Sequence, residues 1–300
     1  MPGARRGAVP PAHLLHERVL GWYADHGRDL PWRAPGCSPW GVFVSEVMSH
    51  QTPIARVEPA WREWMARWPT PADLAAESPG EAVRAWGRLG YPRRALRLRE
   101  AAVAIVERHG GEVPADEDAL RALPGVGAYT AAAVAAFAHG RRTTVVDTNV
   151  RRILARAVEG RALAAPALIA AEARLAASLV PADPPTSASW NVAVMELGAL
   201  VCRARGPRCD ECPLADVCAW RAAGSPVADE APRRGQAWHG TDRQVRGRVL
   251  QVLRERHGPV PREDLEALAD VPGQVDRCVA SLVEDGLLEP LAGERFRLPA

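Results

Sequence analysis

Hydrophobic and polar residues recur at helical spacing along most of the chain. Segments such as EAVRAWGRL, RALRLREAAVAIVERHG, YTAAAVAAFAHG, NVRRILARAVEG and ASWNVAVMELGALVC repeat apolar residues every three or four positions, which gathers them on one helix face. The alternation typical of strands is nearly absent before residue 285. Glycines after helical runs are expected to end the helices, at Gly110, Gly140 and Gly160. Proline-rich segments are expected to separate the helices, at 31–39, 69–71 and 181–185. The pattern predicts an all-α body.

The last 80 residues follow a different plan. The stretch RAAGSPVADEAPRRGQAWHG is rich in glycine, proline and charge and has no periodicity, so residues 223–240 are predicted to form a linker. Beyond it, TDRQVRGRVLQVLRERHG, PREDLEALAD and GQVDRCVASLVEDGLL predict three short amphipathic helices, and EPLAGERFRLPA predicts a hairpin. Three helices followed by a small hairpin indicate a winged-helix-like module over 241–300.

Composition restricts the class of protein. The chain has 300 residues, 47% of them hydrophobic, and a formal net charge of only +2, which by itself says nothing about nucleic acid. We find no apolar run of about 18 residues and no continuous apolar segment near the N-terminus, so we expect a cytosolic protein without membrane spans. All 38 cationic residues are arginine. A chain without lysine has no lysine amine to form a Schiff base.

Four of the six cysteines lie within nineteen residues. Cys202, Cys209, Cys212 and Cys218 are spaced Cys-x6-Cys-x2-Cys-x5-Cys. Cytosolic thiols stay reduced, so a metal site is favoured over disulfides. Four thiolates suit a tetrahedral zinc or a 4Fe-4S cluster, and the spacing alone leaves both open. The other two cysteines are expected to be a loop thiol, Cys37, and a small buried hydrophobe, Cys278.

A glycine-rich turn precedes one of the alanine-rich helices. Leu123-Pro124-Gly125-Val126-Gly127 opens onto YTAAAVAAFAHG, and backbone amides in such a turn, at a helix N-terminus, suit a DNA phosphate. The arrangement would be a helix-hairpin-helix. From these residues alone an ordinary interhelical turn is the favoured alternative, because glycine-rich turns are common.

Two carboxylates stand out as candidate acid and anion. Glu46 lies in the apolar segment WGVFVSEVMSHQT, where it is either on a solvated stripe or desolvated with a raised pKa, and the pattern alone favours the stripe. Asp147, in TTVVDTNVRRILAR, follows a β-branched run and precedes a helix. It is a candidate helix cap, together with Thr148 and Asn149, and the positive end of the helix dipole would keep it ionised.

Taken together, six motifs carry a resemblance. LPWR, VSEVMSHQT, AWGRLGYPRRA, LPGVGAYTA, VVDTNVRR and the cysteine loop resemble, in order and spacing, the endonuclease III superfamily, and most of all its MutY-type adenine DNA glycosylases, over about residues 12–222. The resemblance implies a six-helix module with the helix-hairpin-helix at 31–145, an iron-sulfur module at 8–30 and 146–222 with a 4Fe-4S cluster on the four cysteines, and a DNA cleft. The resemblance therefore favours a DNA-binding role for the glycine-rich turn and catalytic roles for Glu46 and Asp147, instead of the structural roles that the residues alone favour.

The resemblance also implies roles for individual residues. Glu46 would protonate N7 of adenine, Asp147 would stabilise the oxocarbenium ion at the sugar, and Tyr129 and Asn149 would assist on the sugar side. DNA contacts would come from residues of the turn and of two loops: Leu123, Gly125, Val126 and Gly127; His50 and Gln51; Tyr91 and Arg93. The family's usual pair of glutamines is His50-Gln51 here, and its tyrosine pair is Tyr91-Pro92. These departures leave the details of lesion contact open.

The expected function is that of a monofunctional adenine DNA glycosylase of base excision repair. Its substrate would be duplex DNA with adenine opposite 8-oxoguanine or guanine. We expect a monomer in a bacterial cytoplasm that acts at the nucleoid. Tyr129 stands where endonuclease III carries a lysine that leads to strand cleavage. The alternatives are an endonuclease III-like pyrimidine-damage glycosylase and a non-catalytic iron-sulfur DNA-binding regulator. The tail does not fit the family's usual nudix-like domain. It would read the opposite base, contact flanking DNA through Arg243, Arg246 and Arg248, or only stabilise the fold.

Overall fold

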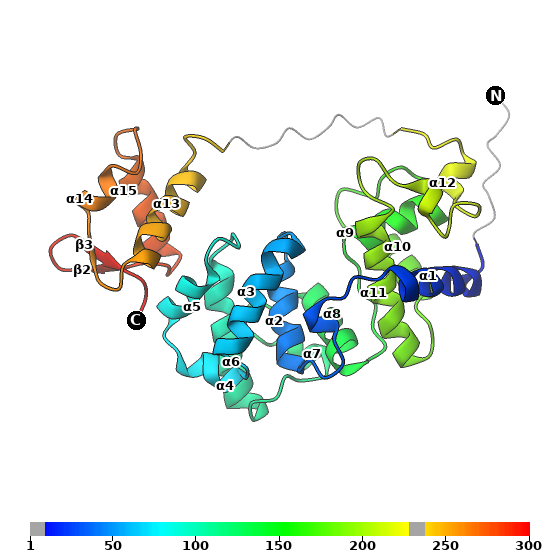
Figure 1. Ribbon diagram of the computed structural model, residues 1–300, viewed down its shortest axis with the longest axis horizontal. Coiled ribbons are helices and arrows are strands. Elements are labelled where there is room, and N and C mark those ends of the chain that lie inside the picture. The colour runs from blue at the N-terminus through cyan, green and yellow to red at the C-terminus, as the bar shows by residue number, and fades with distance from the viewer. Residues whose placement is uncertain (1–9, 228–237) are drawn as a thin grey trace. The chain divides into compact units, whose positions relative to one another are not determined.

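The computed structural model describes residues 10–227 and 238–300. The chain forms two compact units, one made of Met1–Val42, Pro114–Arg121 and Val126–Ala231, the other of Phe43–Val113, Ala122–Gly125 and Pro232–Ala300 (Figure 1). The predicted module boundaries at 31–145, 146–222 and 241–300 stay a prediction, and most of the predicted linker lies outside the described residues. None of the described helices is long and apolar enough to cross a membrane.

The first unit consists of helices around a large apolar cluster and a smaller one around Ala132. They are α1 Ala12–His26, the 3-10 turn η1 Pro31–Arg33, α7 Glu117–Arg121, α8 Ala128–His139, α9 Thr148–Ile153, the π-helical segment η2 Leu154–Val158, α10 Ala170–Ser178, α11 Pro184–Leu200, the 3-10 turn η3 Cys209–Glu211 and α12 Ala219–Ala222. Helix α11 is the central element, because it packs against α1, α8 and α9. Its core partners include Leu15, Val19, Ile153 and Leu154.

Glu196 on α11 fixes the N-terminal segment to this core. Its side chain is 1% exposed and accepts hydrogen bonds from the guanidinium groups of Arg28, at 2.5 and 2.9 Å, and Arg33, at 3.0 Å. Burial alone would raise the pKa of Glu196, but these arginines outweigh it and lower the pKa to about 2. A buried carboxylate with two cationic partners stays ionised and holds its partners in place.

The second unit begins inside α2 Pro39–Ser49 and continues with α3 Ile54–Arg67, α4 Pro71–Ala76, α5 Pro79–Trp86 and α6 Arg93–His109. Its core contains an indole cluster: Trp64 meets Trp68 and Trp86 edge to face, with ring centroids 4.8 and 5.6 Å apart. The indole N–H of Trp64 donates to the Ala85 carbonyl at 3.1 Å, and that of Trp86 to Gly90 at 2.9 Å. The buried donors therefore have partners, as buried tryptophans require.

The same unit ends in a small α+β module. Its elements are α13 Asp242–Glu255, β1 Val260–Pro261, α14 Glu263–Glu266, α15 Gln274–Glu284, β2 Glu289–Leu291 and β3 Arg295–Arg297. The strands form an antiparallel sheet in the order β1-β3-β2, with Phe296 opposite both Val260 and Pro290. The predicted three helices and hairpin are confirmed. Strand β1 was not predicted, because two residues are too short for an alternating pattern.

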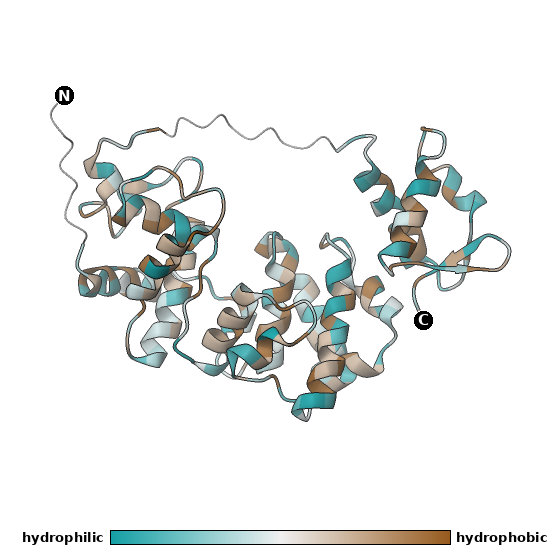
Figure 2. Ribbon diagram, turned by 180° about the vertical axis from the view of Figure 1, so that it is seen from behind, coloured by the Kyte–Doolittle hydropathy of each residue, from teal (hydrophilic) through white to brown (hydrophobic). Residues whose placement is uncertain are grey.

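Helix ends follow the sequence signals. Gly110 and Gly140 end α6 and α8 in the left-handed conformation, as predicted. Gly160 has φ +72° but follows the π-helical segment η2. The prolines at 71 and 184 occupy the first turns of α4 and α11, where the missing N–H costs nothing. In each unit, helices carry hydrophobic residues along some faces and hydrophilic residues along others (Figure 2).

Candidate active site and cysteine site

Glu46 lies on a helix that has almost no solvated face. Residues 40–48 of α2 are all buried, and Glu46 itself is 9% exposed, with Phe43 and Met48 fully buried beside it on the helix. The solvated stripe that the pattern alone favours is therefore wrong, because Glu46 is buried; the raised pKa stays a prediction. A buried carboxyl group in such a position is a candidate for acid–base chemistry.

An extended segment, 143–147, leads to Asp147 and is anchored on two sides. Asn191 on α11 donates to the Thr143 carbonyl at 3.0 Å and accepts from the Val145 N–H at 3.2 Å. The Thr143 hydroxyl donates to the Ala132 carbonyl on α8 at 2.8 Å. Asn191 is 3% exposed, so its amide replaces the strand partner that this buried backbone lacks. The position of Asp147 is thus fixed from α8 and α11.

Asp147 is the N-cap of α9, as predicted. Its carboxylate accepts from the Val150 N–H at 2.7 Å and from the Asn149 side-chain amide at 2.6 Å. Burial nevertheless raises the pKa of Asp147, although those hydrogen bonds and the charge of Arg152 act in the opposite direction. The expectation that the helix start alone keeps this group ionised is therefore too simple, because desolvation outweighs it.

Asn149 links Asp147 to a cation. Its side-chain oxygen accepts from Arg152 at 2.6 Å, and Arg152 also donates to the carbonyls of Gly198 and Cys202, at 2.7 and 2.6 Å. Gly198 permits this close approach of α9 and α11, since a Cβ there would lie 2.6 Å from the Asn149 Cβ. The two predicted sugar-side residues, Asp147 and Asn149, are therefore in direct contact. Tyr129, on α8, is half-buried and packs on the alanine-rich cluster around Ala132.

The glycine-rich turn joins α7 to α8, and these two helices pack together as a helix-hairpin-helix requires. Leu123 is buried, whereas Gly125 and Gly127 are exposed and Val126 is half-buried. Gly125 has φ +75°, and a Cβ there would lie 2.8 Å from the Arg97 Cβ, so no other residue fits. Gly127 caps α8 without a side-chain hydrogen bond. The turn therefore offers a helix N-terminus to an anion.

The two predicted DNA-contact loops share a backbone strain. Gln51 has φ +52° and Tyr91 has φ +47°, in a region that side-chain-bearing residues rarely adopt. Both side chains are exposed, Tyr91 by 53%. Such strain costs about 1–3 kcal/mol per residue and tends to occur at ligand-contacting positions. Arg93, also exposed, forms an ion pair with Asp285 at 3.1 Å.

Arg94 ties these loops to each other and to the helix of Glu46. Its guanidinium donates to the carbonyls of Val47, Met48 and His50, at 2.8, 3.1 and 2.8 Å, and to the Gly90 carbonyl at 3.1 Å. It thereby satisfies the last carbonyls of α2, which lack helical partners. Burial, and then the charge of Arg94, lower the pKa of His50. The imidazole at this departure from the family pattern is therefore neutral at pH 7, like the glutamine it replaces.

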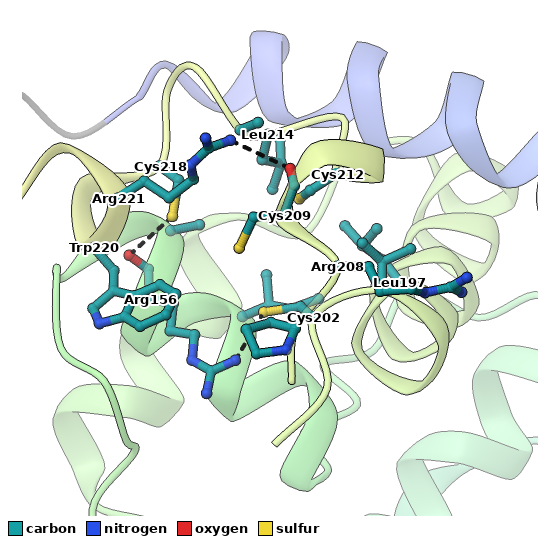
Figure 3. A pocket seen from close by; sticks show the side chains of 15 residues that line it. Arg156, Leu197, Cys202, Arg208, Cys209, Cys212, Leu214, Cys218, Trp220 and Arg221 are labelled. Atoms are coloured by element: carbon teal, nitrogen blue, oxygen red, sulfur yellow. Dashed lines mark hydrogen bonds between the residues drawn. The ribbon is translucent and has the colours of Figure 1, made fainter. Parts of the chain in front are cut away.

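The four clustered cysteines line one hollow of about 400 Å³, part of it open to solvent. Cys202 follows the end of α11, Cys209 begins η3, and Cys218 precedes α12, so three turns converge on the same space (Figure 3). Burial, together with the three neighbouring thiols, raises the pKa of Cys212 to about 11. No three His, Cys, Asp or Glu side chains of the described residues are grouped as around a single metal ion.

Arg156 lies against this hollow from the π-helical segment η2. Its side chain is 5% exposed and donates to the Cys202 sulfur at 3.6 Å and to the Arg203 carbonyl at 2.8 Å. Its guanidinium carbon lies 4.9 Å from the centre of the Trp220 ring, and its own carbonyl accepts from the Cys218 thiol at 3.6 Å. A π-helical turn often marks a functional position. Here it places a buried cation beside four sulfurs.

Sequence reasoning missed the residues that hold these groups: Arg94, Arg152, Arg156, Asn191 and Glu196. None belongs to a spacing pattern, because each acts through contacts far away in the chain. A partial signal exists for Asn191 and Glu196, since both are polar residues inside the apolar helix segment ASWNVAVMELGALVC. Polar side chains in such positions are usually hydrogen-bonded.

The comparisons with known proteins agree with this geometry. Residues 44–175 match the family described as HhH-GPD superfamily base excision DNA repair protein. The solved structure of a thermostable thymine-DNA glycosylase superposes with a TM-score of 0.63 at 26% identity, covering 71% of this chain and 97% of the other. The fold and the helix-hairpin-helix thus define a base excision repair class.

Two curated relatives narrow the class. The chain is 53% identical over 292 residues to an adenine DNA glycosylase of Mycobacterium tuberculosis, covering 96% of this chain and 95% of the relative. It is 52% identical over 282 residues to one of Mycolicibacterium smegmatis, covering 93% and 94%. The chain belongs to the adenine DNA glycosylase family.

Proposed function

We propose that the chain hydrolyses the N-glycosidic bond of adenine paired with 8-oxoguanine or guanine in duplex DNA, as a monofunctional enzyme of bacterial base excision repair. The observation that carries this proposal is the similarity to adenine DNA glycosylases over nearly the whole chain, including the C-terminal module. The choice of opposite base, the monomeric state and the residue roles below are parts of the proposal.

The reaction needs a proton at one end of the bond and a negative charge at the other. As the bond breaks, negative charge develops on the departing adenine and positive charge on the sugar. We assign the proton to Glu46, which is 9% exposed on a helix whose residues 40–48 are all buried. We assign the anion to Asp147, whose oxygens are oriented by Val150 and Asn149. Two carboxyl groups in different surroundings can divide these roles.

Adenine must leave the base stack before both groups can reach it. The exposed Gln51 and Tyr91 are the candidate residues for the vacated space, and Arg94 holds both loops on the helix of Glu46. The strained backbone at both positions supports a ligand-contact role. The helix-hairpin-helix, with exposed Gly125 and Gly127, supports a phosphate contact that positions the duplex.

We infer a 4Fe-4S cluster rather than zinc from the family to which the chain belongs. Four thiolates suit either group, and the four cysteines line the same hollow. Arg156 would offset part of the negative charge that four cluster-bound thiolates carry. When bound, the cluster would cross-link the loop 202–218 to the end of α11, and the residues holding it would be Cys202, Cys209, Cys212 and Cys218.

Strand cleavage is not part of the proposed activity. It would need an amine that attacks the sugar, and the chain has no lysine, while the hairpin position carries Tyr129. The structural similarity to a thymine-DNA glycosylase makes pyrimidine removal the second candidate. Glu46 favours adenine, since a proton donor activates a purine through its ring nitrogen.

The test is to incubate the full chain with duplexes that pair adenine with 8-oxoguanine, adenine with guanine, or thymine with guanine. We expect free adenine from the first two and strand breaks only after alkali. Thymine release without adenine release would replace the proposal with the second candidate. Breaks without alkali would contradict the monofunctional assignment. Broad visible absorption of the purified protein, lost on iron chelation, is expected for the cluster, and zinc with no visible band would contradict it.

A further inference from the structure

The C-terminal module is fixed to α5 by two arginines that cap each other's helices. Arg84, on α5, donates to the carbonyls of Leu253 and Arg256, both at 3.2 Å, and to that of Arg254, at the end of α13. Arg254 in turn donates to the Val83 carbonyl at 3.0 Å. Both sets of carbonyls lie at helix C-termini, where no helical N–H partner is available. Separating the module from α5 would therefore leave several of these acceptors without their donors.

Backbone packing adds to this attachment. The Gly80 N–H donates to the Pro299 carbonyl at 2.7 Å, and a Cβ at Gly80 would lie 2.4 Å from that oxygen. Asp285, after α15, accepts from Arg93 at the start of α6 and from Arg246 on α13. The module is therefore a fixed extension of the α5–α6 pair, and the loop of Tyr91 lies between those two helices in the chain.

This attachment places residues of the module beside Tyr91. The guanidinium carbon of Arg243, on α13, lies 5.9 Å from the centre of the Tyr91 ring and 5.4 Å from that of Trp238. Trp238 is 48% exposed, Tyr91 is 53% exposed, and Arg243 is also exposed. The Tyr91 ring is contacted by a second cation too, because the Arg94 guanidinium lies 5.5 Å from its centre.

Two ring contacts, together with the lack of an ion pair, distinguish Arg243 from the other described cations of the module. Arg248, Arg254 and Arg295 also lack an ion pair, but they donate to backbone carbonyls. Arg246 pairs with Asp285, Arg277 with Asp242, and Arg297 with Glu289. Over residues 10–227 and 238–300, no carboxylate forms an ion pair with Arg243, whose contacts are the two rings. A guanidinium stacked on aromatic faces keeps its N–H edge available for an anion.

We propose that Arg243, held by Trp238 and Tyr91, binds a backbone phosphate of the duplex beside the loop of Tyr91, so that the C-terminal module forms part of the DNA-binding surface. The inference rests on the proposed function, because duplex DNA is its ligand. The partner chemistry follows from the residues: a cation without an acidic partner suits a phosphate, and exposed rings next to it suit the sugar and base edges. Base-specific reading is not part of it, so the contact strengthens binding equally for either opposite base.

The experiment compares Arg243→Gln with Arg248→Gln in the full chain. Arg248 lies five positions along the same helix, about 140° around it, is exposed, and donates to the Leu268 carbonyl. Affinity is measured between 50 and 200 mM salt, roughly the range over which phosphate contacts dominate. The duplexes carry a non-hydrolysable adenine nucleoside opposite 8-oxoguanine or guanine, and an unmodified duplex is the third ligand.

For Arg243→Gln we expect affinity for all three duplexes to fall about tenfold at the lowest salt. The slope of log affinity against log salt should decrease by about 0.9, the value for one phosphate. Trp238→Ala should weaken binding about threefold with an unchanged slope, and Trp238→Phe should restore it. Arg248→Gln should bind as wild type does. Thermal unfolding of each variant checks that the module remains attached.

A wild-type slope and affinity in Arg243→Gln would overturn the inference. A loss confined to the 8-oxoguanine duplex would overturn the phosphate assignment, because a backbone contact carries no base information. These outcomes are separate from the proposed function. If the wild type releases adenine while Arg243→Gln binds normally, only the inference fails; if the wild type releases no adenine, the unmodified duplex still measures the contact.

Discussion

The two candidate catalytic carboxyl groups lie in different surroundings. Glu46 lies in the middle of α2, where every residue from 40 to 48 is buried. Asp147 lies at the start of α9, where hydrogen bonds from Val150 and Asn149 orient its oxygens. Burial raises the pKa of Asp147, and these hydrogen bonds act in the opposite direction. The oriented donors are therefore what supports the anionic role proposed for Asp147.

The comparison extends to the units that carry them. In the unit that carries Asp147, buried polar residues repeatedly have charged or amide partners. Asn191 bonds to Val145, Arg152 to Asn149, and Glu196 to Arg28 and Arg33. The unit that carries Glu46 has an indole cluster in its core, and Arg94 connects the end of α2 to the loop of Gly90. Substitutions in the unit of Asp147 should therefore change the pH dependence of activity or stability. Substitutions in the unit of Glu46 should change the geometry of the loops of Gln51 and Tyr91.

Asp147→Asn should have a larger effect than the changes at Glu196 and Arg94 that follow. Asparagine caps a helix as well as aspartate does but has no charge, so adenine release should fall on the order of 10²–10³-fold. Burial raises the pKa of Asp147, which means that ionisation opposes folding and that this penalty appears as pH rises through the native pKa. The variant should thus be at least as stable as wild type at pH 7. Single-turnover rates and chemical denaturation measure both.

A loss of stability in Asp147→Asn would mean that the charge itself supports the helix start. In the wild type, the rate should also fall on the acid side as Asp147 gains its proton. A rate that is flat down to pH 4, roughly the ordinary range of a carboxyl group, would contradict the raised pKa.

Glu196→Gln should remove an acid-sensitive part of the stability. The pKa of Glu196 is lowered to about 2, so its contribution is full above the ordinary carboxyl value and is lost as pH falls toward 2. The shift corresponds to about 3 kcal/mol. The wild type should lose this much free energy of unfolding below pH 5, and the variant should lose much less. Equal acid sensitivity in both proteins would show that Glu196 is not the group responsible.

Arg94→Gln should cost about 2 kcal/mol of stability, because it leaves carbonyls at the end of α2 without donors. It should also weaken binding to mispaired DNA, since the loops of Gln51 and Tyr91 lose their common anchor. Arg62→Gln, at an exposed site of α3 paired with Glu58, is the matched control. Unchanged DNA affinity in Arg94→Gln, with the stability loss present, would limit Arg94 to a structural role.

Much of this organisation could be predicted from the sequence. Helical spacing predicts the helices, and cysteine spacing predicts that four thiols meet. The prediction that Glu46 lies on a solvated stripe was wrong. Helical periodicity only shows which helix face is more apolar, whereas α2 is buried on every face. The positive φ of Gln51 and Tyr91, the anchoring by Asn191, and the rings around Arg243 depend on neighbours distant in the chain. Local patterns contain no information about such contacts.

The central claim is that Glu46 supplies a proton and Asp147 a negative charge to the same nucleotide. Its most direct test is single-turnover adenine release from a duplex with adenine opposite 8-oxoguanine, by wild type, Glu46→Gln and Asp147→Asn side by side. We expect Glu46→Gln to be slower on the order of 10²–10⁴-fold, and both variants to bind the duplex nearly as wild type does. Adenine release at the wild-type rate by either variant would contradict the claim.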